Sequence, residues 1–116
     1  MKALLHMIHA TKWSVNGIIA AYKKQISFRI ELWCAIFLTF VACKIASDLN
    51  QLLWLLFSVH LVLILELINS AIEAAIDRFG PRRTELSRIA KDSGSAAVFY
   101  AIIFAVVVWT LIIITG

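Results

Sequence analysis

Three long apolar stretches restrict this chain to very few folds. They cover residues 32–46, 52–76 and 96–115, and a helix needs roughly 20 residues to cross a bilayer. Residues 96–115 carry no charged side chain. Their many β-branched residues would favour a strand in water, but a lone strand in lipid leaves its backbone polar groups unpaired, so a helix is expected. The sequence therefore predicts an all-α integral membrane protein with three transmembrane helices.

The remaining segments indicate a single membrane domain over residues 1–116. The expected membrane helices cover about residues 30–47, 51–77 and 93–115. Residues 1–28 mix basic and apolar side chains at spacings of three and four, which predicts an amphipathic helix on the membrane surface. Gly80 and Pro81 are expected to end the second membrane helix, and a basic loop is expected to lead from there into the third.

The basic residues predict the orientation in the membrane. Every Lys and Arg except Lys44 lies either before the first apolar stretch or between the second and the third. By the positive-inside rule both segments face the cytoplasm, and the C-terminus lies outside. Trp54 and Trp109, near helix ends, are expected as interface anchors. The net charge is +4. The basic residues that give this charge lie beside the membrane segments, where they attract anionic lipid headgroups, so no nucleic-acid partner is expected.

The most informative polar pattern is ELINSAIEAAIDR, residues 66–78. Its polar residues are three or four positions apart and therefore share one helix face; they are Glu66, Asn69, Glu73 and Asp77. A carboxylate in hydrocarbon costs about 2.5 to 3.5 kcal/mol. Hydrogen bonds between helices would explain one asparagine. Paired carboxylates, however, require a cation, a proton or a basic partner, and the candidate basic partners are Lys91 and the arginines of the following loop. Phosphoryl transfer and proton or cation transport both use such groups.

Transport is the weaker of these two interpretations. A conduit needs polar groups near both membrane faces, whereas the outer half of every predicted span is apolar apart from Ser58 and His60. We refer to Glu66, Asn69, Glu73 and Asp77 as the acidic stripe. These residues lie at one end of their helix. A reaction at one membrane surface therefore explains it better.

ELINSAIEAAIDR followed by ELSRIAKDSGSAA resembles the signature of the prokaryotic diacylglycerol kinase family. GIIAAYKKQISFRIE, residues 17–31, resembles that family's surface helix running into its first span, so the resemblance covers nearly the whole chain. It implies a homotrimer in the bacterial inner membrane, with sites shared between subunits. The implied reaction transfers the γ-phosphate of ATP, with Mg²⁺, to the hydroxyl of diacylglycerol and gives phosphatidic acid. Undecaprenol or another lipid alcohol is the alternative acceptor.

The resemblance also implies roles for individual residues. Glu66 resembles the general base, Glu73 a ligand of Mg²⁺, and Asn69 and Asp77 supporting polar groups of the site. The implied nucleotide contacts are Lys91, Asp92, Trp13 and His6. The implied lipid contacts are Glu66, Ser95 and Arg29.

Three departures from the family pattern lie on the nucleotide and metal side. Gln25 stands where a second metal-binding glutamate is usual, so it keeps an oxygen ligand but lacks the charge. His6 takes the place of an arginine. Arg82, Arg83 and Thr84 replace an acidic, an aromatic and a histidine residue. Two hypotheses follow: an active kinase with a changed metal site or a different lipid alcohol, or a catalytically impaired paralogue that binds lipid.

Overall fold

The computed structural model describes residues 1–80 and 84–116. The described residues form four helices: α1 (Lys2–Lys24), α2 (Ile26–Ile45), α3 (Leu49–Asp77) and α4 (Glu85–Thr115). Among them, α2, α3 and α4 are each long and apolar enough to cross a membrane. The all-helical prediction with three spanning helices is confirmed. The expected effects of Pro81, Arg82 and Arg83 fall outside the described residues.

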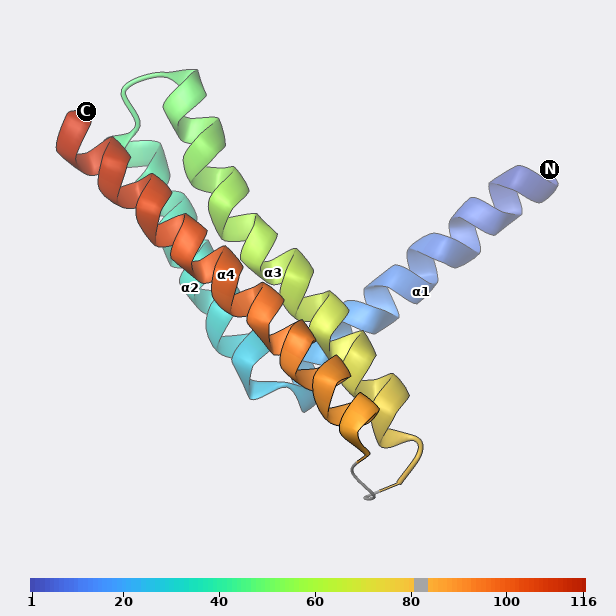
Figure 1. The fold of residues 1–116 in the computed structure, drawn as a ribbon. Coiled ribbons are helices and arrows are strands. Elements are labelled where there is room, and N and C mark those ends of the chain that lie inside the picture. The colour runs from blue at the N-terminus through green and yellow to red at the C-terminus, as the bar shows by residue number, and fades with distance from the viewer. Residues whose placement is uncertain (81–83) are drawn as a thin grey trace.

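The three long helices lie side by side, and α1 leaves them at a steep angle (Figure 1). α3 packs against both α2 and α4. Small buried side chains such as Ala35, Ala42 and Ala101 allow the helix backbones to approach closely, as is usual where lipid supplies no hydrophobic driving force. The first helix of the bundle, α2, and the last, α4, both begin near the C-terminal end of α3 (Figure 1). The end of α1, the start of α2, the end of α3 and the start of α4 are therefore gathered at one end of the bundle (Figure 1).

The length of α3 carries its acidic stripe to the edge of the hydrocarbon. Its 29 residues correspond to about 43 Å, against about 30 Å of hydrocarbon. Asp48 caps its first turn by accepting a hydrogen bond from the Gln51 N–H at 2.8 Å, which marks the polar boundary at that end. About 20 residues from there complete the span. A bilayer whose edge falls at Asp48 would therefore leave Glu73 and Asp77 beyond its other edge.

The start of α4 differs from the sequence expectation. We expected a basic loop up to about residue 93, but the helix begins at Glu85. Thr84 explains this difference, because its hydroxyl accepts a hydrogen bond from the Ser87 N–H at 3.1 Å and so satisfies a free donor of the first turn. The extra turns place Lys91 on the helix that packs beside α3.

Trp109 also differs from its expected role. Its indole Nε1–H donates to Oγ of Ser58 at 3.2 Å, and Ser58 is fully buried. Trp109 therefore ties α4 to α3 within the bundle instead of serving only as an anchor at the interface. An indole N–H in an apolar environment needs such a partner.

α1 is joined to the bundle through Gln25. This residue has an extended backbone (φ −110°, ψ 108°) and ends α1 while it begins α2. The buried residue of α1 is Ala21, close to the joint. Most of the apolar and basic side chains of α1 are exposed, and their placement on a membrane surface stays a prediction.

Candidate active site

Gln25 and Glu73 bring the α1–α2 joint into contact with α3. The Gln25 Nε2–H donates to the Glu73 carboxylate at 3.2 Å, across 48 positions of sequence. Both side chains are half-buried. The two residues that the sequence singled out for a metal site therefore lie together. Gln25 presents its amide nitrogen, a donor, to the Glu73 carboxylate, which can only accept.

Lys91 and Asp77 form the second contact of the site. The Lys91 Nζ lies 2.6 Å from Oδ1 of Asp77, so among the described residues Lys91 is a basic partner of the stripe. Asp92 instead pairs with Arg88 along α4, at 3.3 Å. Because both groups of that pair are more than half exposed, it contributes little to stability. Lys91 is therefore oriented toward α3, whereas Asp92 is directed along the surface of α4.

Glu66 and Asn69 are the buried part of the stripe, with exposed fractions of 5% and 7%. The carboxyl group of Glu66 interacts with that of Glu31 on α2. Within the described residues, Oε2 of Glu31 and Oδ1 of Asn69 are buried without a hydrogen-bond partner. Unpartnered polar atoms in such a place are exceptional in folded proteins and are typical of functional sites.

Glu31 is the residue that sequence reasoning missed. We assigned it no role from the sequence, yet its carboxyl interacts with that of Glu66, the residue expected to be the base. The cost of burying a carboxylate in lipid, which drew attention to residues 66–78, applies equally to a glutamate in the apolar α2 sequence. That signal was sufficient to find it.

Gly94 is required by the close packing of α4 on Asn69. A Cβ atom at this position would overlap the side-chain oxygen of Asn69 and would contact Ile72 on the same helix. Gly94 is itself buried. The absence of a side chain here therefore fixes how near α4 comes to the acidic stripe.

Other residues predicted from the sequence are not brought into this cluster. His6 and Trp13 lie on the exposed part of α1, where their rings make an edge contact with centroids 6.4 Å apart. Ser95 is exposed on α4. Arg29 is half-buried, and its guanidinium lies 6.0 Å from the ring centroid of Tyr22. Their roles in binding nucleotide or lipid stay predictions.

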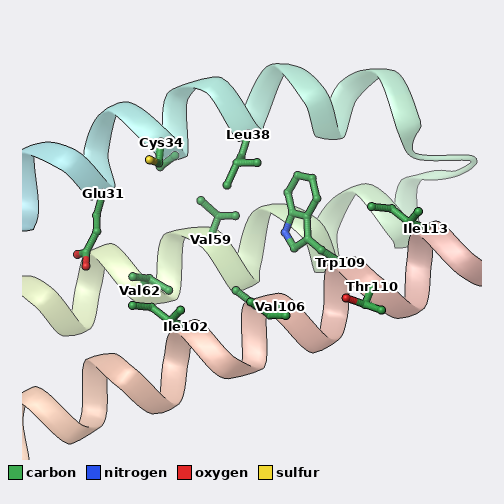
Figure 2. A pocket seen from close by; sticks show the side chains of 12 residues that line it. Glu31, Cys34, Leu38, Val59, Val62, Ile102, Val106, Trp109, Thr110 and Ile113 are labelled. Carbon is green, nitrogen blue, oxygen red and sulfur yellow. The ribbon is translucent and has the colours of Figure 1, made fainter.

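An apolar groove of about 410 Å³ reaches the half-buried Glu31. It lies between α2 and α4 and runs from Glu31 to Ile113, with Cys34 and Leu38 on the α2 wall and Val106 on the α4 wall (Figure 2). The carboxyl of Glu31 is the acidic group of its lining. The groove can therefore hold an apolar chain whose polar end lies near Glu31.

The fold and the site together define a small helical membrane protein with an acidic centre toward one end of its long helices. The sequence pattern of the family described as "Prokaryotic diacylglycerol kinase" matches residues 12–113. The chain belongs to this family and is an enzyme of the kinase type. With its three apolar helices and bacterial relatives, it is a bacterial membrane protein.

Curated relatives extend over most of the chain. The diacylglycerol kinase of Haemophilus influenzae is 41% identical over 91% of this chain and 90% of its own length. That of Escherichia coli is 42% identical over 92% of this chain and 88% of its own. The diacylglycerol kinase of Pseudomonas aeruginosa is 36% identical over 96% of this chain and 90% of its own length.

Proposed function

We propose that this kinase transfers the γ-phosphate of ATP to the hydroxyl of diacylglycerol and gives phosphatidic acid. The observation that carries the proposal is the course of the acidic stripe. It begins at the buried Glu66, beside the end of an apolar groove, and continues along α3 to Glu73, about 10 Å farther along the helix axis. A lipid alcohol approaching from the bilayer and a water-borne phosphate donor would meet between these two levels.

Glu66 is proposed as the general base, because a primary alcohol is a poor nucleophile until its proton is accepted during attack. The alcohol oxygen bonds to the γ-phosphorus while the bond from that phosphorus to the β–γ bridging oxygen breaks. ADP leaves with the electron pair, and the alcohol proton passes to the Glu66 carboxylate. Glu31, in contact with Glu66, positions that carboxylate. Asn69 and Asp77 support the site.

The residues present fit a magnesium ion that arrives with the nucleotide. Within residues 1–80 and 84–116, no three His, Cys, Asp or Glu side chains converge on one point. Mg²⁺ in phosphoryl-transfer sites usually takes one or two protein oxygens and receives the rest from phosphate and water. Glu73 would supply a carboxylate and Gln25 an amide oxygen after its amide rotates. When bound, the ion neutralises charge on the phosphates.

The groove supports a lipid acceptor. Its lining is almost wholly apolar from Leu38 to Ile113 (Figure 2), and a hydrocarbon chain within it would place its polar end beside Glu31. Ser95 and Arg29 are retained as proposed lipid contacts, and Lys91, Asp92, Trp13 and His6 as proposed nucleotide contacts. Undecaprenol has the same chemistry of an alcohol on a long apolar chain, so it remains the alternative acceptor.

We further propose a homotrimer in the inner membrane, with the N-terminus cytoplasmic, the C-terminus outside and sites shared between subunits. Three helices form a thin bundle, and many large apolar side chains of α2, α3 and α4 remain exposed. Association would remove part of this surface and enclose the acids further. The basic residues at the Glu73 end support a cytoplasmic location of that end.

The test is phosphate transfer from labelled ATP with Mg²⁺ to diacylglycerol, monoacylglycerol and undecaprenol in mixed micelles. Glu66→Gln should lower transfer to the preferred acceptor by at least about a hundredfold, the usual contribution of a general base. Glu73→Gln should also lower transfer, because it removes the proposed carboxylate ligand of Mg²⁺. Glu85→Gln is the matched control, because this carboxylate is exposed and its partner, Arg88, is not one of the proposed site residues. Transfer that survives Glu66→Gln would refute the assigned base. No transfer by folded wild-type protein to any acceptor would favour the impaired paralogue.

A further inference from the structure

The joint between α1 and α2 is crossed by a hydrogen bond between two aromatic side chains. The indole Nε1–H of Trp33, on α2, donates to the phenol oxygen of Tyr22, on the last turn of α1, at 3.1 Å. Tyr22 lies three residues before Gln25, at which the two helices meet, and Trp33 lies about 12 Å along α2 from Gln25. The bond therefore closes a triangle whose corner is Gln25. We refer to this pair as the Tyr22–Trp33 brace.

Tyr22 makes a second contact with α2. The guanidinium of Arg29 lies 6.0 Å from the centroid of the Tyr22 ring, at the outer limit of a cation–π contact. Arg29 and Trp33 are four residues apart and therefore share one face of α2. Tyr22 lies against that face, so its side chain joins the last turn of α1 to two successive turns of α2.

The angle of α1 depends on side-chain contacts near the joint. The backbone of Gln25 is extended between two helices, and such a residue can change φ and ψ while both helices stay intact. Within the described residues, Ala21 is the buried residue of α1, and from there the helix projects away from the bundle (Figure 1). The brace spans this hinge and restricts its rotation.

The hinge residue is also one of the two proposed metal ligands. The side chain of Gln25 donates to Glu73 at 3.2 Å. Any rotation of φ and ψ at Gln25 redirects its Cβ, and with it the amide group that meets Glu73. A displacement of about 1 Å in a catalytic site can lower a rate about a hundredfold. The angle of α1 and the geometry of the metal side of the site are therefore coupled.

We propose that the Tyr22–Trp33 brace fixes the angle of α1 and thereby holds Gln25 against Glu73, so that Tyr22 and Trp33 are positioning residues of the kinase. The inference rests on the proposed function, in which Gln25 and Glu73 hold the Mg²⁺ that arrives with ATP. The brace acts through the hinge and supplies no ligand itself. Its loss should weaken the metal site without changing the residues that form it.

The first experiment measures the joint without turnover, by amide hydrogen exchange of micellar protein in EDTA. Tyr22→Phe removes the hydroxyl but keeps the ring beside Arg29, and Trp33→Phe removes the N–H donor. Each should speed exchange of the Gln25 amide, which donates to the Ala21 carbonyl at 2.8 Å. The expected increase is about two- to tenfold, the factor that one net hydrogen bond contributes to an equilibrium. The double variant should show no further increase, and unchanged exchange in both single variants would overturn the proposal.

The second experiment is a Mg²⁺ titration of phosphate transfer by the same variants. Tyr22→Phe and Trp33→Phe should each raise the Mg²⁺ concentration for half-maximal transfer by about two- to tenfold. Trp54→Phe is the matched control, because this exposed tryptophan lies near the start of α3 and contacts Phe57; its Mg²⁺ requirement should equal that of the parent. A brace that only stabilises the fold would lower the unfolding temperature and leave the Mg²⁺ requirement unchanged, which would refute the positioning role.

The two experiments also separate this inference from the proposed function. If the parent transfers phosphate while both brace variants keep its Mg²⁺ requirement and its exchange at Gln25, the brace assignment is wrong and the kinase stands. If the folded parent transfers phosphate to no acceptor, the proposed function fails, and the role of the brace in Mg²⁺ binding fails with it. Exchange at Gln25 then still decides whether the brace holds the joint.

Discussion

Replacement of Gln25 by glutamate tests the metal side of the site. In the structure the Gln25 amide donates to Glu73 at 3.2 Å. Gln25→Glu removes that donor and places a second negative charge at nearly the same distance. Two unit charges 3.2 Å apart repel by about 5 kcal/mol at an effective dielectric constant of 20, and by about 1 kcal/mol in bulk water. Since both side chains are half-buried, the repulsion should fall between these values.

A bound Mg²⁺ should turn the destabilising effect of Gln25→Glu into a stabilising one. Without a cation, Gln25→Glu should lower the unfolding temperature, because the two carboxylates repel and the hydrogen bond is lost. With saturating Mg²⁺ and nucleotide the repulsion is replaced by attraction to the ion, and stability should recover. Recovery of only about 1.4 kcal/mol corresponds to a tenfold lower Mg²⁺ concentration for half-maximal transfer. A tenfold shift is therefore the smallest that we expect.

The assay combines a Mg²⁺ titration of phosphate transfer with thermal unfolding in EDTA and in Mg²⁺ with ADP. Gln25→Met is the matched control, because it removes the amide without adding a charge and should raise the Mg²⁺ requirement. A half-saturating Mg²⁺ concentration that Gln25→Glu leaves unchanged, together with unaltered unfolding in EDTA, would refute the proposal that Gln25 and Glu73 form the metal site.

The packing of α4 gives three further predictions, each measured by unfolding in detergent. Gly94→Ala should destabilise by about 1 to 3 kcal/mol, because its Cβ overlaps a neighbouring amide, and the helical control Gly17→Ala should not destabilise. Equal stability of the two would contradict the close contact. Trp109→Phe should lower the free energy of unfolding by about 1 kcal/mol, because the hydrogen bond to Ser58 is lost. ATP affinity should stay unchanged, and a changed affinity would show that Trp109 has a role in the site. Thr84→Ala should cost about 1 kcal/mol and speed amide exchange in the first turn of α4, whereas unchanged exchange would exclude capping.

Much of the fold could be predicted from the sequence because a bilayer permits so few arrangements. A long apolar segment in lipid must pair its own backbone groups, so α2, α3 and α4 followed from length and composition. The common face of Glu66, Asn69 and Glu73 followed from helical periodicity alone. Threonine is a common N-cap, so Thr84 could have predicted the start of α4. We instead interpreted the basic residues after it as a loop and therefore expected α4 to begin later than it does.

The sequence by itself determined the spanning helices, the end at which the acidic stripe lies and the family of the chain. Only the tertiary structure decided which side chains from different helices meet. It brought the carboxyl groups of Glu31 and Glu66 close enough to interact, and it placed Gln25 beside Glu73 and Lys91 beside Asp77. The physical reason is that periodicity fixes the face of one helix, whereas contacts between helices depend on the rotation, depth and crossing of each pair, which small residues such as Gly94 set locally.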